Sequence, residues 1–184
     1  MGIKRYTANA DTTITNAYKA NLRTRGTGSN MGLADSLEVF HIYGQESSSS
    51  AENSRVLINF PVTTTITTDR SAGTIPASGS VSWFLRVHNV VHPNTLPKNY
   101  NMTISAISRS WDEGTGLDME GYTDSGSCNW TAAASSSSGV TAWTTAGGDY
   151  HASTTGSTVY FDNGTEDIEV DISHLVEEGI KGQS

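Results

Sequence analysis

Short alternations of apolar and polar residues constrain the fold more than any other feature of this chain. A period of two places every second side chain on the same face of a β-strand. In residues 166–173 (EDIEVDIS), Ile168, Val170 and Ile172 fall on one face and polar residues on the other. Comparable segments, each bounded by turn residues, predict further strands at 36–43, 55–60, 81–91, 100–108 and 158–162.

Helical periodicity is confined to the C-terminal end. Residues 174–180 are the best helix candidate, and Ser173 is well placed to be its N-cap. Six or more strands and one helical turn predict an all-β fold, an antiparallel β-sandwich of the jelly-roll kind. We expect at most a short C-terminal helical turn. A length of 184 residues is enough for one domain with its own core, so a single domain over 1–184 is predicted.

The longest interruption of the strand pattern covers residues 111–157. Loops longer than about 12–15 residues are usually functional or disordered. This segment holds three of the four tryptophans, Trp111, Trp130 and Trp143, and each has roughly 200 Å² of surface to bury. We therefore expect a long ordered loop over the sandwich with Trp111 as a structural anchor. Trp83, which alternates with apolar strand residues, is predicted to be a second anchor in the core.

Composition and charge exclude several classes of function. The net charge of −8 argues against binding to nucleic acid or to an anionic membrane, because both need a basic surface. With a single cysteine, no intrachain disulfide forms. No run approaches the ~18 apolar residues that span a bilayer. Residues 1–11 lack the apolar region of a secretory signal, so we expect synthesis in the cytoplasm and an N-terminal arm at 1–10.

The acids of the long loop are the first candidates for chemistry. Paired carboxylates could cleave a glycoside, and loop carboxylates are also ligands that Ca²⁺ prefers. The candidate residues are Asp112, Glu113, Asp118 and Glu120. No nucleophile elbow, HExxH motif or phosphate loop accompanies them. We predict that the chain is not an enzyme and that catalytic residues and cofactors are absent, with Ca²⁺ or solvated acids as the alternatives for this segment.

Two further groups of residues have open interpretations. The segment FDNGTED at 161–167 could hold an ion, but its Asn-Gly pair makes it a good turn by chemistry alone. Aromatic residues of the long loop could stack on sugar rings or contact a partner, or they could pin the loop onto the sheet. These candidates are Tyr122, Trp130, Trp143 and Tyr150.

Several short motifs follow one another in a particular order. An Asp-Thr pair at 11–12 is followed by Asn-x-Gly at 30–32 and by Leu-x-Val at 37–39. Trp-x-Glu-Gly comes later, at 111–114, and Gly-Gly-Asp at 147–149. This order resembles that of DNRLRE-type domains over nearly the whole chain.

The resemblance implies a jelly-roll β-sandwich with a non-enzymatic role. Domains of this family occur in bacterial polysaccharide-binding modules and in structural proteins of tailed bacteriophages, particularly marine ones. The long polar insertions here look most like the phage versions. The expected function is therefore that of a virion structural protein, a capsid decoration or a tail or fibre component. It would contact other virion proteins and copies of itself, as a homo-oligomer located in the virion. The alternative is a carbohydrate-binding module that recognises a host or algal polysaccharide.

The C-terminal end departs from the family pattern. Domains of this kind finish with a further strand, whereas this sequence stops at Ser184. Either the sequence is truncated or another element completes the sheet. A missing strand leaves an open edge, and a neighbouring subunit could fill it by β-augmentation.

Overall fold

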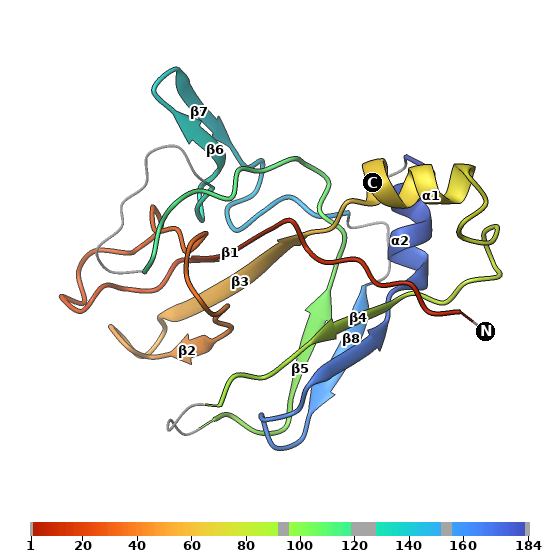
Figure 1. Ribbon diagram of the computed structural model, residues 1–184. Coiled ribbons are helices and arrows are strands. Elements are labelled where there is room, and N and C mark those ends of the chain that lie inside the picture. The colour runs from red at the N-terminus through yellow and green to blue at the C-terminus, as the bar shows by residue number, and fades with distance from the viewer. Residues whose placement is uncertain (1, 92–95, 119–127, 152–155, 183–184) are drawn as a thin grey trace. The chain divides into compact units, whose positions relative to one another are not determined.

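The computed structural model describes residues 2–91, 96–118, 128–151 and 156–182 (Figure 1). Antiparallel β-ladders are the main regular structure of the described chain, beside two short α-helices, which confirms the all-β class. Contacts between Cα atoms group the chain into two compact units. Unit 1 comprises residues 1–60 and 109–149, and unit 2 comprises 61–108 and 150–184. The jelly-roll sandwich and the single domain over 1–184 stay predictions.

Unit 1 is built on a three-stranded antiparallel sheet. Its strand order is β1 (Ala10–Thr15), β3 (Ala51–Asn59) and β2 (His41–Tyr43), so the longest strand lies in the centre. Ala10 lies opposite Asn59 at one end of β1. Ile14 is completely buried and Leu57 nearly so, and they form part of the unit's core. The threonines of β1 are buried as well, so this strand is covered on both faces.

A second ladder of unit 1 lies inside the segment that was predicted to be one long loop. Strands β6 (Ala132–Ser136) and β7 (Gly139–Ala142) form a two-stranded antiparallel hairpin. The loop prediction for 111–157 is wrong for these residues. Alanine, serine and glycine give little contrast between apolar and polar positions, and every residue of β7 is exposed. The sequence therefore carries no alternation that would have indicated either strand.

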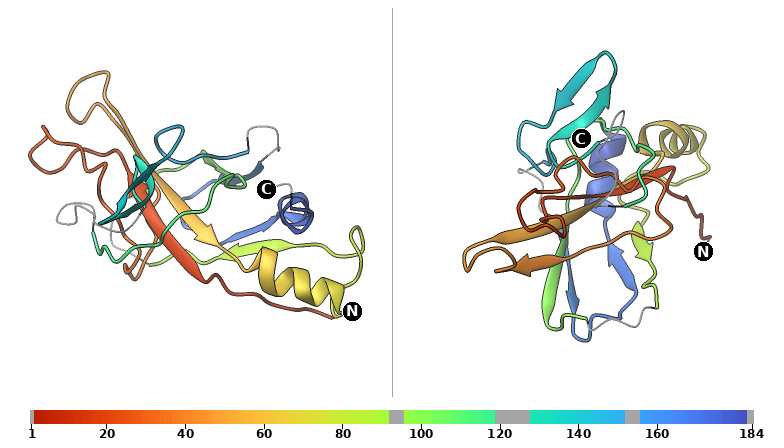
Figure 2. Two further views of the ribbon diagram at one scale, coloured as in Figure 1. Left: turned by 90° about the horizontal axis from the view of Figure 1, so that it is seen from above. Right: turned by 90° about the vertical axis from the view of Figure 1, so that its left-hand side faces the viewer.

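Unit 2 contains two further antiparallel pairs. Strand β4 (Phe84–Val87) pairs with β9 (Ile168–Asp171), and β5 (Tyr100–Ile104) pairs with β8 (Ser157–Phe161), as Figure 2 shows for the second pair. The alternation is the expected one, because Leu85 lies opposite Val170 and the rings of Tyr100 and Phe161 stack with centroids 4.7 Å apart. Four of the predicted strands are thus confirmed, although β4 and β5 are shorter than the predicted segments.

The helical content exceeds the prediction of at most one terminal turn. Helix α2 (Ser173–Ile180) has eight residues, and a π-helical segment, η1 (Val62–Ile66), continues into α1 (Thr67–Ser71). Residues 62–68 (VTTTITT) are mostly β-branched and have low intrinsic helix propensity. Burial of Ile66, which is only 3% exposed, anchors this segment against the unit's interior. No helix of the described residues combines the length and the apolar character that crossing a membrane requires.

A polar cluster ties α2 to α1 within unit 2. The Arg70 guanidinium donates two hydrogen bonds to the Glu177 carboxylate, at 3.1 and 2.7 Å. The indole N–H of Trp83 donates to the same carboxylate at 2.9 Å. These donors, Arg70 first, lower the pKa of Glu177 to about 2. Ser173 is not the N-cap; its hydroxyl accepts the backbone N–H of Trp83 at 2.8 Å instead.

Candidate functional site

Asn30 joins two of the sequence motifs into one clamp in unit 1. Its side-chain amide is 1% exposed and donates to the carbonyl oxygens of Glu113 and Cys128, at 2.7 and 2.9 Å. Its oxygen accepts the backbone N–H groups of Gly32 and Gly116, at 3.0 and 2.9 Å. The Asn-x-Gly turn and the Trp-x-Glu-Gly segment are therefore held together by one side chain.

The two glycines of this clamp lie where a side chain has no room. A Cβ atom on Gly32 would come within 2.3 Å of the Glu113 carbonyl oxygen, and one on Gly116 within 1.9 Å of the Asn30 carbonyl oxygen. Real Cβ atoms do not approach so closely, so an alanine at either position would force the backbones apart. The clamp is a structural device that fixes the path of residues 113–118.

Those of the predicted metal ligands that the structure describes are not gathered into one site. Asp112 and Asp118 are exposed, and Glu113 is half-buried. Glu113 accepts the backbone N–H of Asp11 at 2.8 Å. The pKa of Asp11 is raised, first by burial and then by repulsion from Glu113. No group of three or more His, Cys, Asp or Glu side chains that could hold a metal ion occurs in the described part of the chain. Glu120 lies outside the described residues.

The second acidic segment forms a turn. The Glu166 carboxylate accepts the backbone N–H groups of Asp162 and Asn163, at 3.0 and 2.6 Å. These bonds, with that to Asn163 first, lower the pKa of Glu166. Gly164 has φ +80°, a left-handed conformation that glycine adopts readily. Glu166 thus closes the turn between β8 and β9.

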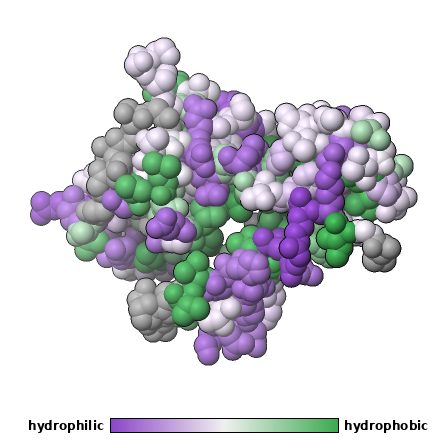
Figure 3. Space-filling model, viewed as in Figure 1, coloured by the Kyte–Doolittle hydropathy of each residue, from purple (hydrophilic) through white to green (hydrophobic). Residues whose placement is uncertain are grey.

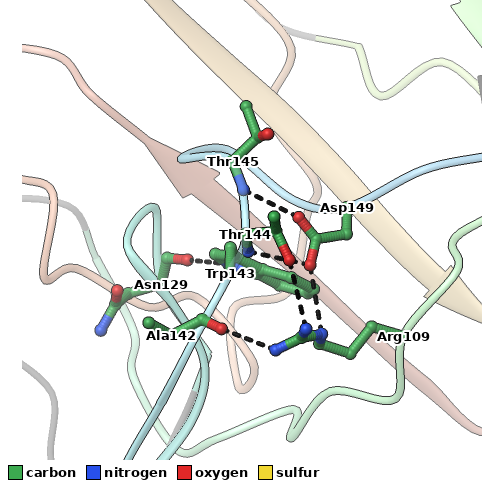
Figure 4. A network of polar contacts seen from close by, with 7 residues as sticks. All are labelled: Arg109, Asn129, Ala142, Trp143, Thr144, Thr145 and Asp149. Atoms are coloured by element: carbon green, nitrogen blue, oxygen red, sulfur yellow. Dashed lines mark hydrogen bonds and ion pairs between the residues drawn. The ribbon is translucent and has the colours of Figure 1, made fainter.

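Trp130 and Trp143 are buried in unit 1, at 8% and 5% exposure. The Trp143 indole N–H donates to the Asn129 carbonyl oxygen at 2.8 Å, as Figure 4 shows. The Arg55 guanidinium lies over the Trp130 ring, 5.2 Å from its centroid. Of the two alternatives for these tryptophans, the structure favours pinning of the loop, because neither offers a free face to a sugar ring.

Asp149 of the Gly-Gly-Asp motif fixes the same region. Its carboxylate accepts the backbone N–H groups of Thr144 and Thr145, both at 2.9 Å, and pairs with Arg109 at 3.1 Å (Figure 4). These contacts, the Thr144 N–H first, lower the pKa of Asp149. Arg109 also donates to the Ala142 carbonyl oxygen at 2.7 Å. The motif therefore anchors the β6–β7 hairpin to the chain on either side of it.

The remaining predicted residues occupy different environments. Tyr150 is 53% exposed and belongs to unit 2. Trp83 and Trp111 are both half-buried, and Trp83 packs at the start of β4 with its N–H bonded to Glu177. Tyr122 lies outside the described residues. Cys128 is completely buried, and burial first, then the charge of Asp112, raises the pKa of its thiol to about 12, so it stays protonated at neutral pH.

A groove of about 360 Å³ opens on the sheet of unit 1. Part of its lining comes from β1 and the residues after it, namely Thr15, Ala17 and Tyr18. Phe40 and Ile42 line it from the side of β2, with Gln45 and Asp118 completing the lining. A backbone bridge between Asn30 and Asp118 holds Asp118 there, so the clamp described above also positions one wall of the groove.

A buried carboxyl group contacts residues that line this groove. Glu52 of β3 is directly opposite Ile42 in the ladder and is 0% exposed. Its oxygens accept the Tyr18 backbone N–H at 3.3 Å and the Ser50 hydroxyl at 3.4 Å, which are long hydrogen bonds. Asp118 is the acidic residue among those that line the groove.

Strand β2 borders the groove and is one of the two edge strands of its sheet (Figure 1). The Ser54 N–H donates to the Phe40 carbonyl, and the Gly44 N–H donates to the Ser50 carbonyl. The backbone N–H and C=O groups of the even-numbered residues therefore point towards β3. Those of His41 and Tyr43 point to the opposite, outer side. No hydrogen bond reaches those groups on that side from the described residues.

The side chains along this edge are exposed and largely apolar. Val39 is 48% and Tyr43 71% exposed, and the rings of His41 and Tyr43 stack with centroids 5.1 Å apart. Figure 3 shows hydrophobic residues interrupting the polar surface in several places, including its left-hand part. We define the β2 edge as residues 39–43 with their outward peptide groups.

Comparison with known proteins finds no family model, no curated protein and no solved structure that matches the chain. The resemblance to DNRLRE-type domains therefore stays a prediction. The description of the groove and the β2 edge rests on the structure of this chain and on no relative.

Sequence reasoning did not find the groove. Its walls are residues remote in sequence, such as Tyr18 and Asp118, and no motif links them. A signal was present in 36–43, where apolar residues occupy both strand faces: Val39 and Tyr43 on one, Phe40 and Ile42 on the other. Such a strand is either buried on both faces or available for contacts, and the structure shows that it is exposed.

Proposed function

We propose that this chain is a non-enzymatic structural protein of a bacteriophage particle. It would decorate the capsid or form part of a tail or fibre, and it would act through protein–protein contacts. The observation that supports the proposal is the β2 edge, because an open strand edge with exposed apolar side chains is a template for another chain. The order of the sequence motifs supports the phage setting.

Particle composition tests this proposal. Phage particles that carry this gene are purified by density gradient, and their proteins are quantified by mass spectrometry. The expected result is a fixed copy number per particle, with density for the chain on the particle surface or tail in cryo-electron microscopy. Its absence from intact particles contradicts the proposal.

The groove favours a second candidate function, carbohydrate binding. The Phe40 ring and the face of the Tyr18 ring that Arg25 leaves uncovered could pack against a sugar. The Gln45 amide could donate hydrogen bonds to the sugar hydroxyl groups or accept them, and the Asp118 carboxylate could accept them. A glycan array with Tyr18→Ala beside Tyr150→Ala tests it. Binding that is lost only in Tyr18→Ala would support this function, and an array without any binding would remove it.

A further inference from the structure

We propose that the β2 edge binds an extended, basic segment of another protein, which adds to the β1–β3–β2 sheet as a fourth strand. This inference rests on the proposed function, in which the chain acts through protein contacts. It goes further by assigning the place of contact and the chemistry of the partner.

The two edges of the sheet differ in a way that leaves only one for a partner. At β1, the backbone N–H of Asp11 donates to the Glu113 carboxylate at 2.8 Å, so residues of the same chain occupy that side. At β2, the peptide groups of His41 and Tyr43 point outward with no partner from the described residues. Each exposed peptide group gains a hydrogen bond when a strand is added there.

The side chains of the β2 edge supply the contacts that accompany strand addition. Val39, His41 and Tyr43 share one face, while Phe40 and Ile42 line the groove on the other. An added strand alternates its side chains in the same way, so it would place every second residue against the stacked His41 and Tyr43 rings. The other side chains of the added strand would point to the opposite face and reach the rim of the groove.

Charge decides which segment fits. Residues 26–54 contain four acids, Asp35, Glu38, Glu46 and Glu52, and no lysine or arginine. Glu38 and Glu46 are exposed on either side of β2. Two arginines flank this stretch and are held by neutral groups: Arg25 stacks on the Tyr18 ring and bonds the Asn16 carbonyl, and Arg55 bonds the Gly147 carbonyl.

An acidic edge attracts lysine and arginine and repels acids. A second copy of this chain carries the same net charge of −8 and the same acidic β2 edge, so self-pairing brings like charges together. A basic segment instead places its cations near Glu38, Glu46 and the groove that contains Asp118. The occupant is therefore a basic strand of a different protein.

Titration of the full chain with defined peptides tests the inference. Three capped pentapeptides alternate valine with lysine, with glutamine or with glutamate, and ¹⁵N-edited NMR spectra report the contact. The lysine peptide is expected to shift the His41 and Tyr43 amide signals and to bind at least about tenfold more tightly than the glutamine peptide at low salt. Raising the salt concentration is expected to weaken it, because salt screens exposed charges.

Two variants separate strand addition from simple charge attraction. His41→Pro removes an outward N–H and is expected to reduce lysine-peptide binding about tenfold. The control Val140→Pro, in the exposed strand β7, is expected to leave binding unchanged. The double variant Glu38→Gln, Glu46→Gln keeps the edge but is expected to reduce the preference for the lysine peptide over the glutamine peptide. It serves as the test if His41→Pro fails to fold.

Several outcomes overturn the inference. They are equal binding of the three peptides, signal shifts away from β2, and unchanged binding in both the proline and the double variant. Shifts at β2 that depend on protein concentration in the absence of peptide would also overturn it, because they indicate that a second copy of the chain binds there. The particle experiment is read separately. Presence in particles without peptide binding removes only this inference, whereas peptide binding without presence in particles removes the phage proposal.

Discussion

Unit 2 and unit 1 are both small β-structures, yet different interactions hold them together. In unit 2, paired strands turn alternate apolar residues inward, as Leu85 does opposite Val170 and Tyr100 opposite Phe161. A mostly buried ion pair lies at the contact between its helices, at Arg70 and Glu177. Removal of apolar surface from water is the main source of its stability.

In unit 1, hydrogen bonds of buried polar side chains contribute much of the stabilisation. Asn30 makes five side-chain hydrogen bonds, and Asp149 orders the loop beside the β6–β7 hairpin. The threonines of β1 are buried, as is Glu52 of β3. Such networks are costly to interrupt, because each unpaired buried group loses its hydration without compensation. The comparison shows that a chain with few apolar residues can build one region on alternation and another on polar clamps.

The largest effect is expected in the apolar core of unit 2. Phe161→Ala removes a ring that is 2% exposed and stacked on Tyr100, and it should lower the free energy of unfolding by about 4 kcal/mol. Urea denaturation measures the loss, and hydrogen exchange locates it. Faster exchange in β5 and β8 than in β1 and β3 supports two separately stabilised units. An equal increase in all four strands would show a single cooperative unit and remove the distinction.

The next largest effect is expected at the clamp of unit 1. Asn30→Ala leaves the Gly32 and Gly116 N–H groups and two carbonyl oxygens without their partner and should cost about 3 kcal/mol. The control Asn101→Ala changes an exposed asparagine of β5 and should cost less than about 0.5 kcal/mol. Urea denaturation followed by tryptophan fluorescence measures both. A loss at Asn30 no larger than that of the control would contradict the structural role of the clamp.

A smaller effect, dependent on pH, is expected at the helix contact of unit 2. Glu177→Gln should cost about 2 kcal/mol at neutral pH, because it removes a charged acceptor of Arg70 and Trp83. The folded pKa of Glu177, about 2, lies below its ordinary value of 4.5. The carboxylate therefore stabilises the fold fully above pH ~4.5, and this contribution is lost as the pH falls towards 2.

Thermal denaturation between pH 7 and 2 checks this prediction, and Glu169→Gln is its control. Glu169 pairs with Arg86, but both side chains are 57% exposed, so its removal should change stability by less than about 0.5 kcal/mol. The difference between the wild type and Glu177→Gln should shrink in acid. A difference that is constant over this range would show that the carboxylate charge does not stabilise the helix contact.

The smallest effect on stability is expected at the β2 edge. Tyr43→Thr alters a side chain that is 71% exposed, so the free energy of unfolding should change by less than about 0.5 kcal/mol. Binding of the lysine peptide should nevertheless weaken, because the stacked pair with His41 is lost. Parallel denaturation and NMR titration measure the two quantities. A large loss of stability would place Tyr43 in the core and weaken the view of this edge as a contact surface.

The contrast between the units also explains what the sequence could predict. Strands β4, β5, β8 and β9 were predicted because inward residues such as Leu85 and Val170 are large and apolar, and their neighbours are polar. The β6–β7 hairpin was missed because alanine and serine do not mark one face. The helix at 62–71 was missed because its β-branched residues indicate strand, and burial of Ile66 overrides that preference.

For the candidate site, the sequence supplied the parts but not their arrangement. The motifs at Asn30 and Glu113 were recognised, but their contact spans 83 residues of chain and no periodicity encodes it. The aromatic residues chosen as a surface, Trp130 and Trp143, proved to be buried, because a large ring is as useful for filling a core as for binding a ligand. The groove depends on tertiary contacts alone, so a linear reading does not show it.

The clamp glycines have a consequence for how this sequence can change over time. Gly32 and Gly116 each lie against the backbone of the opposite segment, so a smaller neighbouring side chain would not remove the closest contact at either position. In a library of all single substitutions, both positions should reject every replacement, even alanine. A compensating second substitution should be rare as well, because a substitution changes a side chain and leaves the blocking carbonyl groups in place. We therefore expect both glycines to stay unchanged while the residues around them vary. Asn30, Gly32, Glu113 and Gly116, with their spacing, are the residues that we expect distant relatives to share.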